Sequence, residues 1–267
     1  MRSTKGIGVR SASGVMASGD EDKRHAHNRH VVEAILWIIG VIVLVIFSVI
    51  VHMHLGPWPV DLQTTISEQH INYPPWVHTI IDLVSHTNDP IPAGVALVVW
   101  TLGLLVFRKW LQALFIAGGT LLSDGINFMD NILVGRPRPS SPLIHIFQPE
   151  PIKSFPSGHV EHDVVYYGFL LFLSFSKPVR QWRYYRFLLP FQIIAAFIIV
   201  TIGYSRIYEG SHWLTDVLGG YLSGAILLRP SSGSIAGPAP NSRNAAPGKC
   251  ASTSNNRAEP FPLHRVI

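Results

Sequence analysis

The chain alternates between polar stretches and apolar segments that are long enough for membrane-spanning helices. The first apolar segment, Ala34 to Val51, has 18 residues without a charge, close to the roughly 20 that cross about 30 Å of hydrocarbon. Five further segments, each bounded by charges, prolines or glycines, are Ile91 to Phe107, Leu111 to Val134, Val160 to Phe175, Phe187 to Tyr204 and Trp213 to Leu228. The pattern predicts an all-α fold, a six-span transmembrane helical bundle over residues 31–228.

Both ends of the chain are polar. Residues 1–30 are rich in Gly, Ser and His and cannot bury a core, so they are expected to form a flexible cytosolic tail. Residues 229–267 are rich in Ser, Gly, Pro and Asn without periodicity, which predicts a disordered tail. The first apolar segment lacks a small-residue cleavage site after it and is expected to be a retained span. Arg229-Pro230 limits the sixth segment to 16 residues, about 24 Å of helix.

Composition agrees with a membrane protein and excludes several other classes. The chain is 48% hydrophobic and only 14% charged, which is too apolar for an ordinary soluble domain. Its formal net charge is +5, but the cations are clustered, so nucleic acid is not an expected partner. The lone cysteine, Cys250, excludes an intrachain disulfide and a thiolate metal site.

The distribution of cations predicts the orientation. The segment from Gly56 to Pro90 contains neither Lys nor Arg, whereas the second and fourth turns between spans contain Arg108, Lys109, Lys177, Arg180, Arg183 and Arg186. Because cations in short loops resist translocation, the amino terminus is expected in the cytosol, and residues 56–90 on the outer face of the cell membrane. Within this outer segment, the spacing of apolar residues predicts an interfacial helix over Trp76 to Ser85.

The two remaining outer loops contain cations that the positive-inside tendency does not explain, namely Arg136, Arg138, Lys153 and Arg206. A phosphate group would explain them, because guanidinium groups bind its oxygens in pairs and disperse its charge. Ser157 and Gly158 precede the fourth span, where free backbone N–H groups favour an anion, although a simple helix cap would also explain this serine.

Two histidines stand at the outer ends of spans. His212 and Asp216 are four residues apart, so on one helix the carboxylate can hold the imidazole in one tautomer. A neutral, oriented imidazole can attack phosphorus and form a phosphohistidine, while His159 protonates the departing oxygen. A single histidine of this kind is usually a packing residue, but two beside arginine-bearing loops favour catalysis.

Three motifs together resemble the type 2 phosphatidic acid phosphatase (PAP2) superfamily of membrane lipid phosphatases. Arg138-Pro139 ends the first motif, and Pro156-Ser157-Gly158-His159 is the second. The third is Ser205-Arg206 with His212 and Asp216. The second motif alone is weak, but all three in order between predicted spans form a specific signal, which covers Gly56 to Leu228.

The resemblance implies the roles of these residues. His212 is the nucleophile, Asp216 orients it, and His159 is the general acid. The phosphate is bound by Arg138, Arg206, Ser157 and Gly158, together with Asn131, which stands where the first motif has lysine. An amide supplies no charge, and the loss of a charge-assisted bond is worth about 1.5–3 kcal/mol. Lys153 and Arg136, in the same loop, are the candidate substitutes. No metal or other cofactor is expected.

The expected function is hydrolysis of a lipid phosphate monoester or diphosphate, with phosphatidic acid, phosphatidylglycerol phosphate, prenyl diphosphates and sphingoid phosphates as candidate substrates. A lipid-phosphate binding or transport relative that has lost hydrolysis is the alternative, favoured only by Asn131. A vanadate-dependent haloperoxidase has a similar site, but those proteins are soluble. The polar stripe of Asp124, Asn127 and residue 131 is expected to hold helices together, with a role in the site as the alternative.

Overall fold

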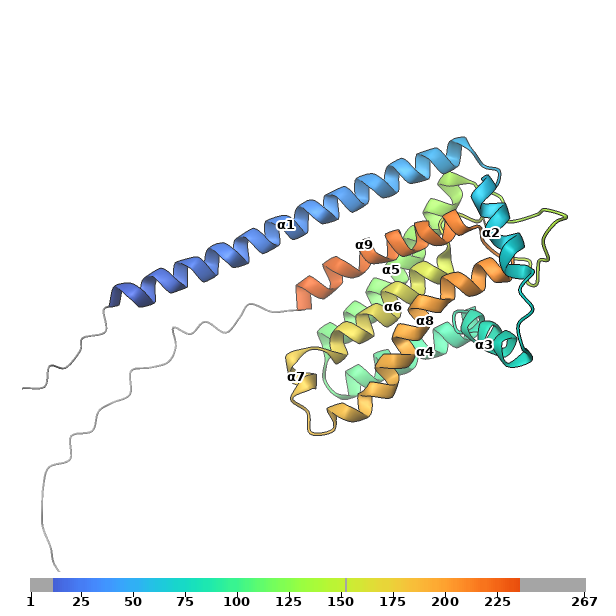
Figure 1. Cartoon of the computed structure of the whole chain (residues 1–267). Helices are drawn as coiled ribbons and strands as arrows, with labels where there is room; N and C mark the ends of the chain where they lie inside the picture. Colours follow the sequence, from blue (N-terminus) through green and yellow to red (C-terminus); the bar gives the residue numbers. More distant parts are fainter. Residues whose placement is uncertain (1–11, 152, 236–267) are drawn as a thin grey trace, which may run out of the picture. The chain divides into compact units, whose positions relative to one another are not determined.

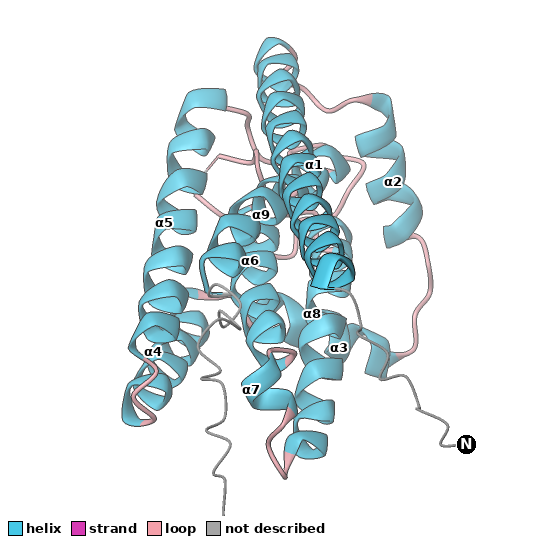
Figure 2. Ribbon diagram, turned by 90° about the vertical axis from the view of Figure 1, so that its left-hand side faces the viewer, coloured by secondary structure: helices cyan, strands magenta, loops and turns pink. Residues whose placement is uncertain are grey.

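The computed structural model describes residues 12–151 and 153–235, and the regular secondary structure of this part of the chain is entirely helical (Figures 1 and 2). In chain order the helices are α1 (Ala12–Met53), α2 (Pro59–Gln69), α3 (Pro75–His86), α4 (Pro90–Val106), α5 (Trp110–Val134), α6 (Gly158–Ser174), α7 (Lys177–Arg180), η1 (Tyr185–Leu188), α8 (Leu189–Tyr208) and α9 (Leu214–Ile235). The predicted all-α fold class is confirmed for the described residues, and each predicted apolar segment overlaps a helix.

The helix α6 lies inside the bundle and packs against α5, α8 and α9 (Figure 2). Its buried Val160 and Val164 pack with Ile202 of α8 and Val217 of α9. The contact with α9 is close, because a Cβ atom on Gly224 would lie 2.8 Å from Cβ of Val164. This packing brings the amino-terminal ends of α6 and α9 together at one end of the bundle.

The helix α1 packs along α9 and α5 (Figure 1). Near its end, Val51 is buried against Val134 and Phe155. Further along, the indole Nε1 of Trp37 donates a hydrogen bond to the carbonyl of Ile226 at 3.0 Å. Most of the large apolar side chains between residues 31 and 50 are nevertheless exposed. Such a surface is typical of a helix whose solvent is lipid.

The number of membrane spans is not confirmed. Within the described residues, two helical stretches are long and apolar enough to cross a membrane, His27–Met53 and Tyr185–Tyr208. The pair Pro75–His86 and Pro90–Val106, bent by 64°, would make a third if it acts as one span. Helices α4 and α6 are 17 residues long. Acids and amides in α5 and acids in α6 also lower the hydropathy of these helices. Six spans therefore remain a prediction.

Two helices extend beyond the predicted limits of the membrane domain. Helix α1 begins at Ala12, so residues 12–30, expected to be part of a flexible tail, are helical. Helix α9 continues through Arg229 and Pro230 to Ile235 rather than ending at residue 228. Helix growth adds one hydrogen bond per residue once a nucleus exists, so apolar segments extend their helices into weakly helical neighbours. Residues 1–11 and 236–267, which include most of the predicted disordered tail, lie outside the described residues.

The segment between α1 and α4 folds over the end of the bundle where α8 finishes. The predicted helix from Trp76 is confirmed as α3, whereas α2 was not predicted from its apolar spacing. The hydroxyl groups of Tyr73 and Tyr204 are 2.8 Å apart, and the hydroxyl of Tyr204 donates to Glu68 of α2 at 2.9 Å. These contacts fix the α2–α3 segment to α8 and position it beside the α5–α6 loop.

Candidate active site

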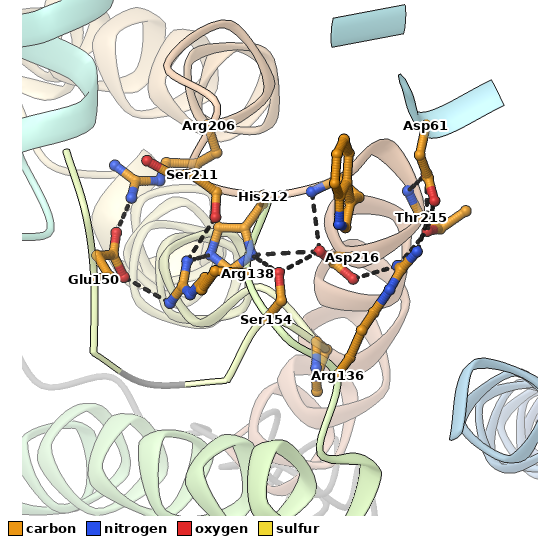
Figure 3. Close-up of polar contacts among 12 residues, drawn as sticks. Asp61, Arg136, Arg138, Glu150, Ser154, Arg206, Ser211, His212, Thr215 and Asp216 are labelled. Carbon is orange, nitrogen blue, oxygen red and sulfur yellow. Dashed lines mark hydrogen bonds and ion pairs between the residues drawn. The ribbon is translucent and has the colours of Figure 1, made fainter. Parts of the chain in front are cut away.

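The motif residues come together at one end of the bundle from three parts of the chain, and Figure 3 shows Arg138, Arg206, His212 and Asp216 in one cluster. The loop between α5 and α6 contributes Arg138, and its last residue, Ser157, occupies the N-cap position of α6 without a capping hydrogen bond from its side chain. Helix α6 begins with Gly158 and His159, and α8 contributes Arg206 near its end. The short connection between α8 and α9 contains His212, and the first turn of α9 contains Asp216.

A tight turn at the end of α8 fixes the position of the α5–α6 loop. Gly210 has a φ of +67°, and a Cβ atom there would lie 2.5 Å from the carbonyl oxygen of His145. Next to this contact, the amide of Phe147 donates to the carbonyl of Glu209 at 3.0 Å. The side chain of Gln69 binds both backbone groups of His145, at 2.7 and 2.8 Å. The loop is thus attached to the corner that precedes His212.

The side chain of His212 is buried, and both of its ring nitrogens have partners. A guanidinium nitrogen of Arg138 lies 2.7 Å from Nε2, and Oγ of Ser154 lies 3.4 Å from Nδ1. Because a guanidinium can only donate, Nε2 must accept, and the ring proton must be on Nδ1. This tautomer leaves the lone pair of Nε2 directed toward the arginine.

The predicted pairing of His212 with Asp216 is indirect, and the two residues do not share a helix, because α9 begins at Leu214. Their closest atoms, Nδ1 and Oδ2, are 3.8 Å apart, which is too long for a hydrogen bond. The hydroxyl of Ser154 bridges the gap by donating to Oδ2 of Asp216 at 2.5 Å while its oxygen faces Nδ1 of the histidine. Ser154 was not identified from the sequence, although it lies only two residues before the second motif.

The carboxylate of Asp216 is held by a buried ion pair. Arg136 donates to Oδ1 of Asp216 at 2.6 Å and to Oδ2 of Asp61 at 2.7 Å, and the side chains of all three are fully buried. Asp61 also accepts the backbone N–H of Thr215 at 2.9 Å. Arg136 is therefore occupied by two carboxylates and is not available to replace the motif lysine. Lys153, the other candidate, is exposed.

The two remaining arginines meet at a carboxylate that the sequence analysis did not single out. Arg138 donates to Glu150 at 2.6 Å, and Arg206 contacts the other oxygen of the same carboxylate. On its other side, Arg206 donates to Glu209 at 3.0 Å and to the hydroxyl of Ser85 at 2.5 Å. The arginines thus form a cationic pair whose shared partner in this state is Glu150 (Figure 3).

The second motif lies against this pair. A ring nitrogen of His159, a ring nitrogen of His212 and a carboxylate oxygen of Glu150 all lie within 4.8 Å of one another. Nε2 of His159 and Oγ of Ser157 are buried and have no hydrogen-bond partner among the described residues. The backbone N–H of Ser157 donates to the carbonyl of Asp216 at 3.0 Å. The two histidines are therefore close enough to contact one tetrahedral phosphoryl group.

Asn131 is the one predicted phosphate-binding residue that is directed elsewhere. Its side-chain nitrogen is 3.0 Å from the carbonyl of Pro156 and 3.1 Å from Oδ1 of Asn127. It therefore supports the turn before Ser157. The rest of the polar stripe joins α5 to α6, since Asn127 donates to Glu161 at 2.9 Å and Asp124 pairs with His162 at 2.8 Å. This agrees with the expected role in holding helices together.

A pocket of ≈ 430 Å³ opens beside His159, between α4, α5 and α6. Its walls are mainly apolar, with a few polar side chains, and include Ala93, Gly94, Leu97, Leu121, Asp124, Phe128 and His162. Pockets of this size and lining are typical of sites for small molecules or parts of larger ones. The pocket leads from His159 to exposed apolar side chains of α4 and α5.

The site favours an anion over a cation. Glu150, His159 and His212 offer three atoms with a spacing that a metal ion could use. The carboxylate among them is already bonded to two guanidinium groups, which would repel a metal cation. Burial, reinforced by the guanidinium groups of Arg138 and Arg206, holds the pKa of His212 well below its usual range. Burial also holds the pKa of His159 well below that range, with Arg206 adding to the effect.

These depressed pKa values predict that the protein loses stability in mild acid. Below about pH 6.5 an unfolded histidine binds a proton that the folded protein resists, so the free energy of unfolding falls as the pH is lowered. We expect the melting temperature in detergent to fall between pH 7.5 and 5.5, and less steeply in His212→Gln. Equal slopes in the two proteins would contradict a neutral, buried His212.

Fold and site together define a helical membrane protein with an anion site of histidines and arginines at one end of its bundle. Comparison with known proteins supports this class. The model of the PAP2 superfamily matches residues 109–232. Phosphatidylglycerophosphatase B of Bacillus subtilis (strain 168) is 31% identical over 164 residues, which cover 58% of this chain and 73% of that protein. The chain belongs to the PAP2 superfamily.

Solved structures show the same fold. The crystal structure of the transmembrane PAP2 type phosphatidylglycerolphosphate phosphatase from Bacillus subtilis has a TM-score of 0.58 and 23% identity, and the match covers 74% of this chain and 94% of that chain. The structure of Aquifex aeolicus LpxE has a TM-score of 0.50 and 21% identity, covering 65% and 95%. At this level of identity the likeness concerns the fold.

Proposed function

We propose that the protein hydrolyses the terminal phosphate monoester of a membrane lipid, with a phosphatidylglycerol phosphate as the first candidate substrate. The observation that carries the proposal is the approach of the His159 and His212 ring nitrogens to within 4.8 Å of each other, beside the arginine pair. A phosphoryl group between them would meet a nucleophile on one side and a proton donor on the other. The names of the relatives support the choice of lipid.

The first chemical step transfers the phosphoryl group to the protein. Nε2 of His212 attacks phosphorus, and the bond from phosphorus to the lipid oxygen breaks with its electron pair on that oxygen. Protonated His159 gives its proton to this oxygen, and the lipid alcohol leaves. The low pKa of His159 in the free protein requires that the dianionic phosphate favour its protonation on binding. Arg138 and Arg206 stabilise the charge on the equatorial oxygens.

The second step releases phosphate. Neutral His159 accepts a proton from water, whose oxygen attacks phosphorus, and the phosphorus–nitrogen bond breaks with its electrons returning to Nε2 of His212. The sum of both steps consumes one water and yields a lipid alcohol and inorganic phosphate. Ser154 and Asp216 stabilise the charge on the His212 ring while it carries the phosphoryl group. No step requires a metal or another cofactor.

The pocket beside His159 would hold the alcohol part of the substrate. Its apolar walls lead to exposed side chains on α4 and α5, such as Val98 and Leu121. The acyl chains would thus stay in lipid while the phosphate enters the site. Asp124 and His162 supply polar contacts in the wall, which suit a hydroxyl-bearing glycerol unit.

We further propose that six helices cross the cell membrane, with the amino terminus in the cytosol and the site at the outer face. The turn with Arg108 and Lys109 and the segment from Lys177 to Arg186 connect the helix ends that lie away from the site. This concentration of exposed Lys and Arg at the end of the bundle away from the site supports that orientation, because cytosolic loops are enriched in Lys and Arg.

Phosphate release from a panel of lipids tests the proposal. Purified protein should act on phosphatidylglycerol phosphate with a kcat/KM at least about tenfold above that for a prenyl diphosphate or a water-soluble phosphate ester, since only the first places a glycerol in the pocket and chains in lipid. A preference for the prenyl compound would overturn the substrate assignment. No release from any lipid would favour the binding or transport alternative.

A further inference from the structure

Glu150 occupies the position where the proposed reaction needs the phosphate. Its carboxylate bridges Arg138 and Arg206, and one of its oxygens lies within 4.8 Å of ring nitrogens of both His159 and His212. A guanidinium pairs with carboxylate and phosphate oxygens through the same forked geometry. The carboxylate and a bound phosphoryl group are therefore alternative partners of the same two arginines.

The carboxylate is held in place from both sides, but it is not locked there. Its loop is attached to α2 and to the α8–α9 corner through His145 and Phe147. The side chain of Glu150 itself remains 20% exposed, whereas that of Arg206 is fully buried. Glu209 stays on the other side of Arg206, fixed by the hydroxyl of Ser85. A ligand can thus replace the first carboxylate while the second continues to neutralise the arginine.

We propose that Glu150 is a specificity residue, which makes the arginine pair select phosphate monoesters over phosphodiesters. A diester carries a single negative charge, so exchanging it for the carboxylate brings no gain in charge. A monoester carries about 1.5 to 2 negative charges near pH 7 and gains from both arginines after Glu150 leaves. The inference rests on the proposed function, because it assumes that the phosphate binds between these arginines.

Selection against phosphodiesters matters because the bilayer around the protein is rich in them. The phospholipids of a membrane are mostly phosphodiesters, and the pocket beside His159 opens toward apolar surface that lipid would cover. Without a competing anion, Arg138 and Arg206 would bind the headgroups of the bilayer itself. Glu150 would keep the pair neutralised until a group of higher charge arrives.

Inhibition kinetics test the proposal on the full chain in detergent. Short-chain phosphatidic acid serves as the monoester substrate and short-chain phosphatidylglycerol as the diester inhibitor. In Glu150→Gln we expect the ratio of the diester Ki to the monoester KM to fall at least about tenfold. Glu150→Asp keeps the carboxylate and should restore part of the ratio. Glu68→Gln removes the same charge from the outer face without touching the arginines, and should keep the wild-type ratio.

Two outcomes would overturn the inference. In the first, Glu150→Gln leaves the ratio of the diester Ki to the monoester KM unchanged. In the second, Ki and KM both rise, which would mean that Glu150 only orients the arginines. If no protein releases phosphate, the proposed function fails, and the binding of the same two lipids, measured by isothermal titration, decides the inference separately. Tighter diester binding by Glu150→Gln than by the wild type supports it, and equal binding rejects it.

Discussion

Replacing His212 by glutamine is expected to reduce phosphate release by roughly 10⁴-fold or more, because the side-chain amide has no nucleophilic nitrogen. Glutamine is similar in size to histidine and can still accept from Arg138 and donate to Ser154, the two partners of the buried ring. The melting temperature should therefore change little, which separates loss of chemistry from loss of fold. Steady-state phosphate release and thermal unfolding in the same detergent check both parts.

The variant His159→Gln distinguishes the two histidines. With lipid substrates the rate of phosphate release by this variant should fall about 10² to 10⁴-fold, since the alkoxide leaves without a proton. With a p-nitrophenyl ester, whose leaving group needs no proton, the first step should survive and the second should stall. We expect a burst of nitrophenol and an acid-labile phosphoprotein. An acid-labile phosphoprotein formed by His212→Gln would show that the nucleophile lies elsewhere.

The hydrophobic pattern predicted the presence of the helices better than the residues at which they begin and end. Apolar runs of helical length identified the segments that form α4, α5, α6 and α8, because an apolar helix is stabilised both by burial in the protein and by contact with lipid. Helix α2 was missed because its contacts come from distant partners, such as Asp61 binding Thr215 of α9. The start of α1 at Ala12 was missed because helix propagation overrides weak local preference.

The motifs predicted which residues gather but not all of their partners. The spacing of His212 and Asp216 predicted a direct contact one helical turn apart. In the structure the hydroxyl of Ser154 links the two side chains, and only the folding of the α5–α6 loop places Ser154 between them. The resemblance made Arg138 and Arg206 phosphate-binding residues and left Arg136 as a candidate substitute for the motif lysine. In the fold one of them, Arg136, is buried between carboxylates, and the other two share Glu150. Spacing along a chain cannot distinguish these environments.

The environment of Arg136 leads to the second large effect. Its guanidinium lies between the carboxylates of Asp61 and Asp216, and no side chain of the three is exposed. Removing one partner from a buried ion pair leaves an uncompensated charge, which costs about 3–5 kcal/mol. We therefore expect Arg136→Met to lower the free energy of unfolding by about that amount. Turnover should fall as well, because Asp216 loses the donor that fixes Oδ1.

Arg136→Lys and a double variant make this prediction specific. Lysine keeps the charge but cannot bridge two carboxylates with a planar fork, so its cost should be intermediate, about 1–3 kcal/mol. Asp61→Asn in the Arg136→Met background removes one of the two unpaired carboxylate charges. The double variant should therefore be more stable than the sum of the two single effects predicts. Arg180→Met, at an exposed cation in α7, should stay within about 0.5 kcal/mol of the wild type. Additive effects at residues 61 and 136 would show that the two side chains do not pair in the membrane, and the support of Asp216 would then have to come from Ser154 and the backbone N–H of Trp213 alone.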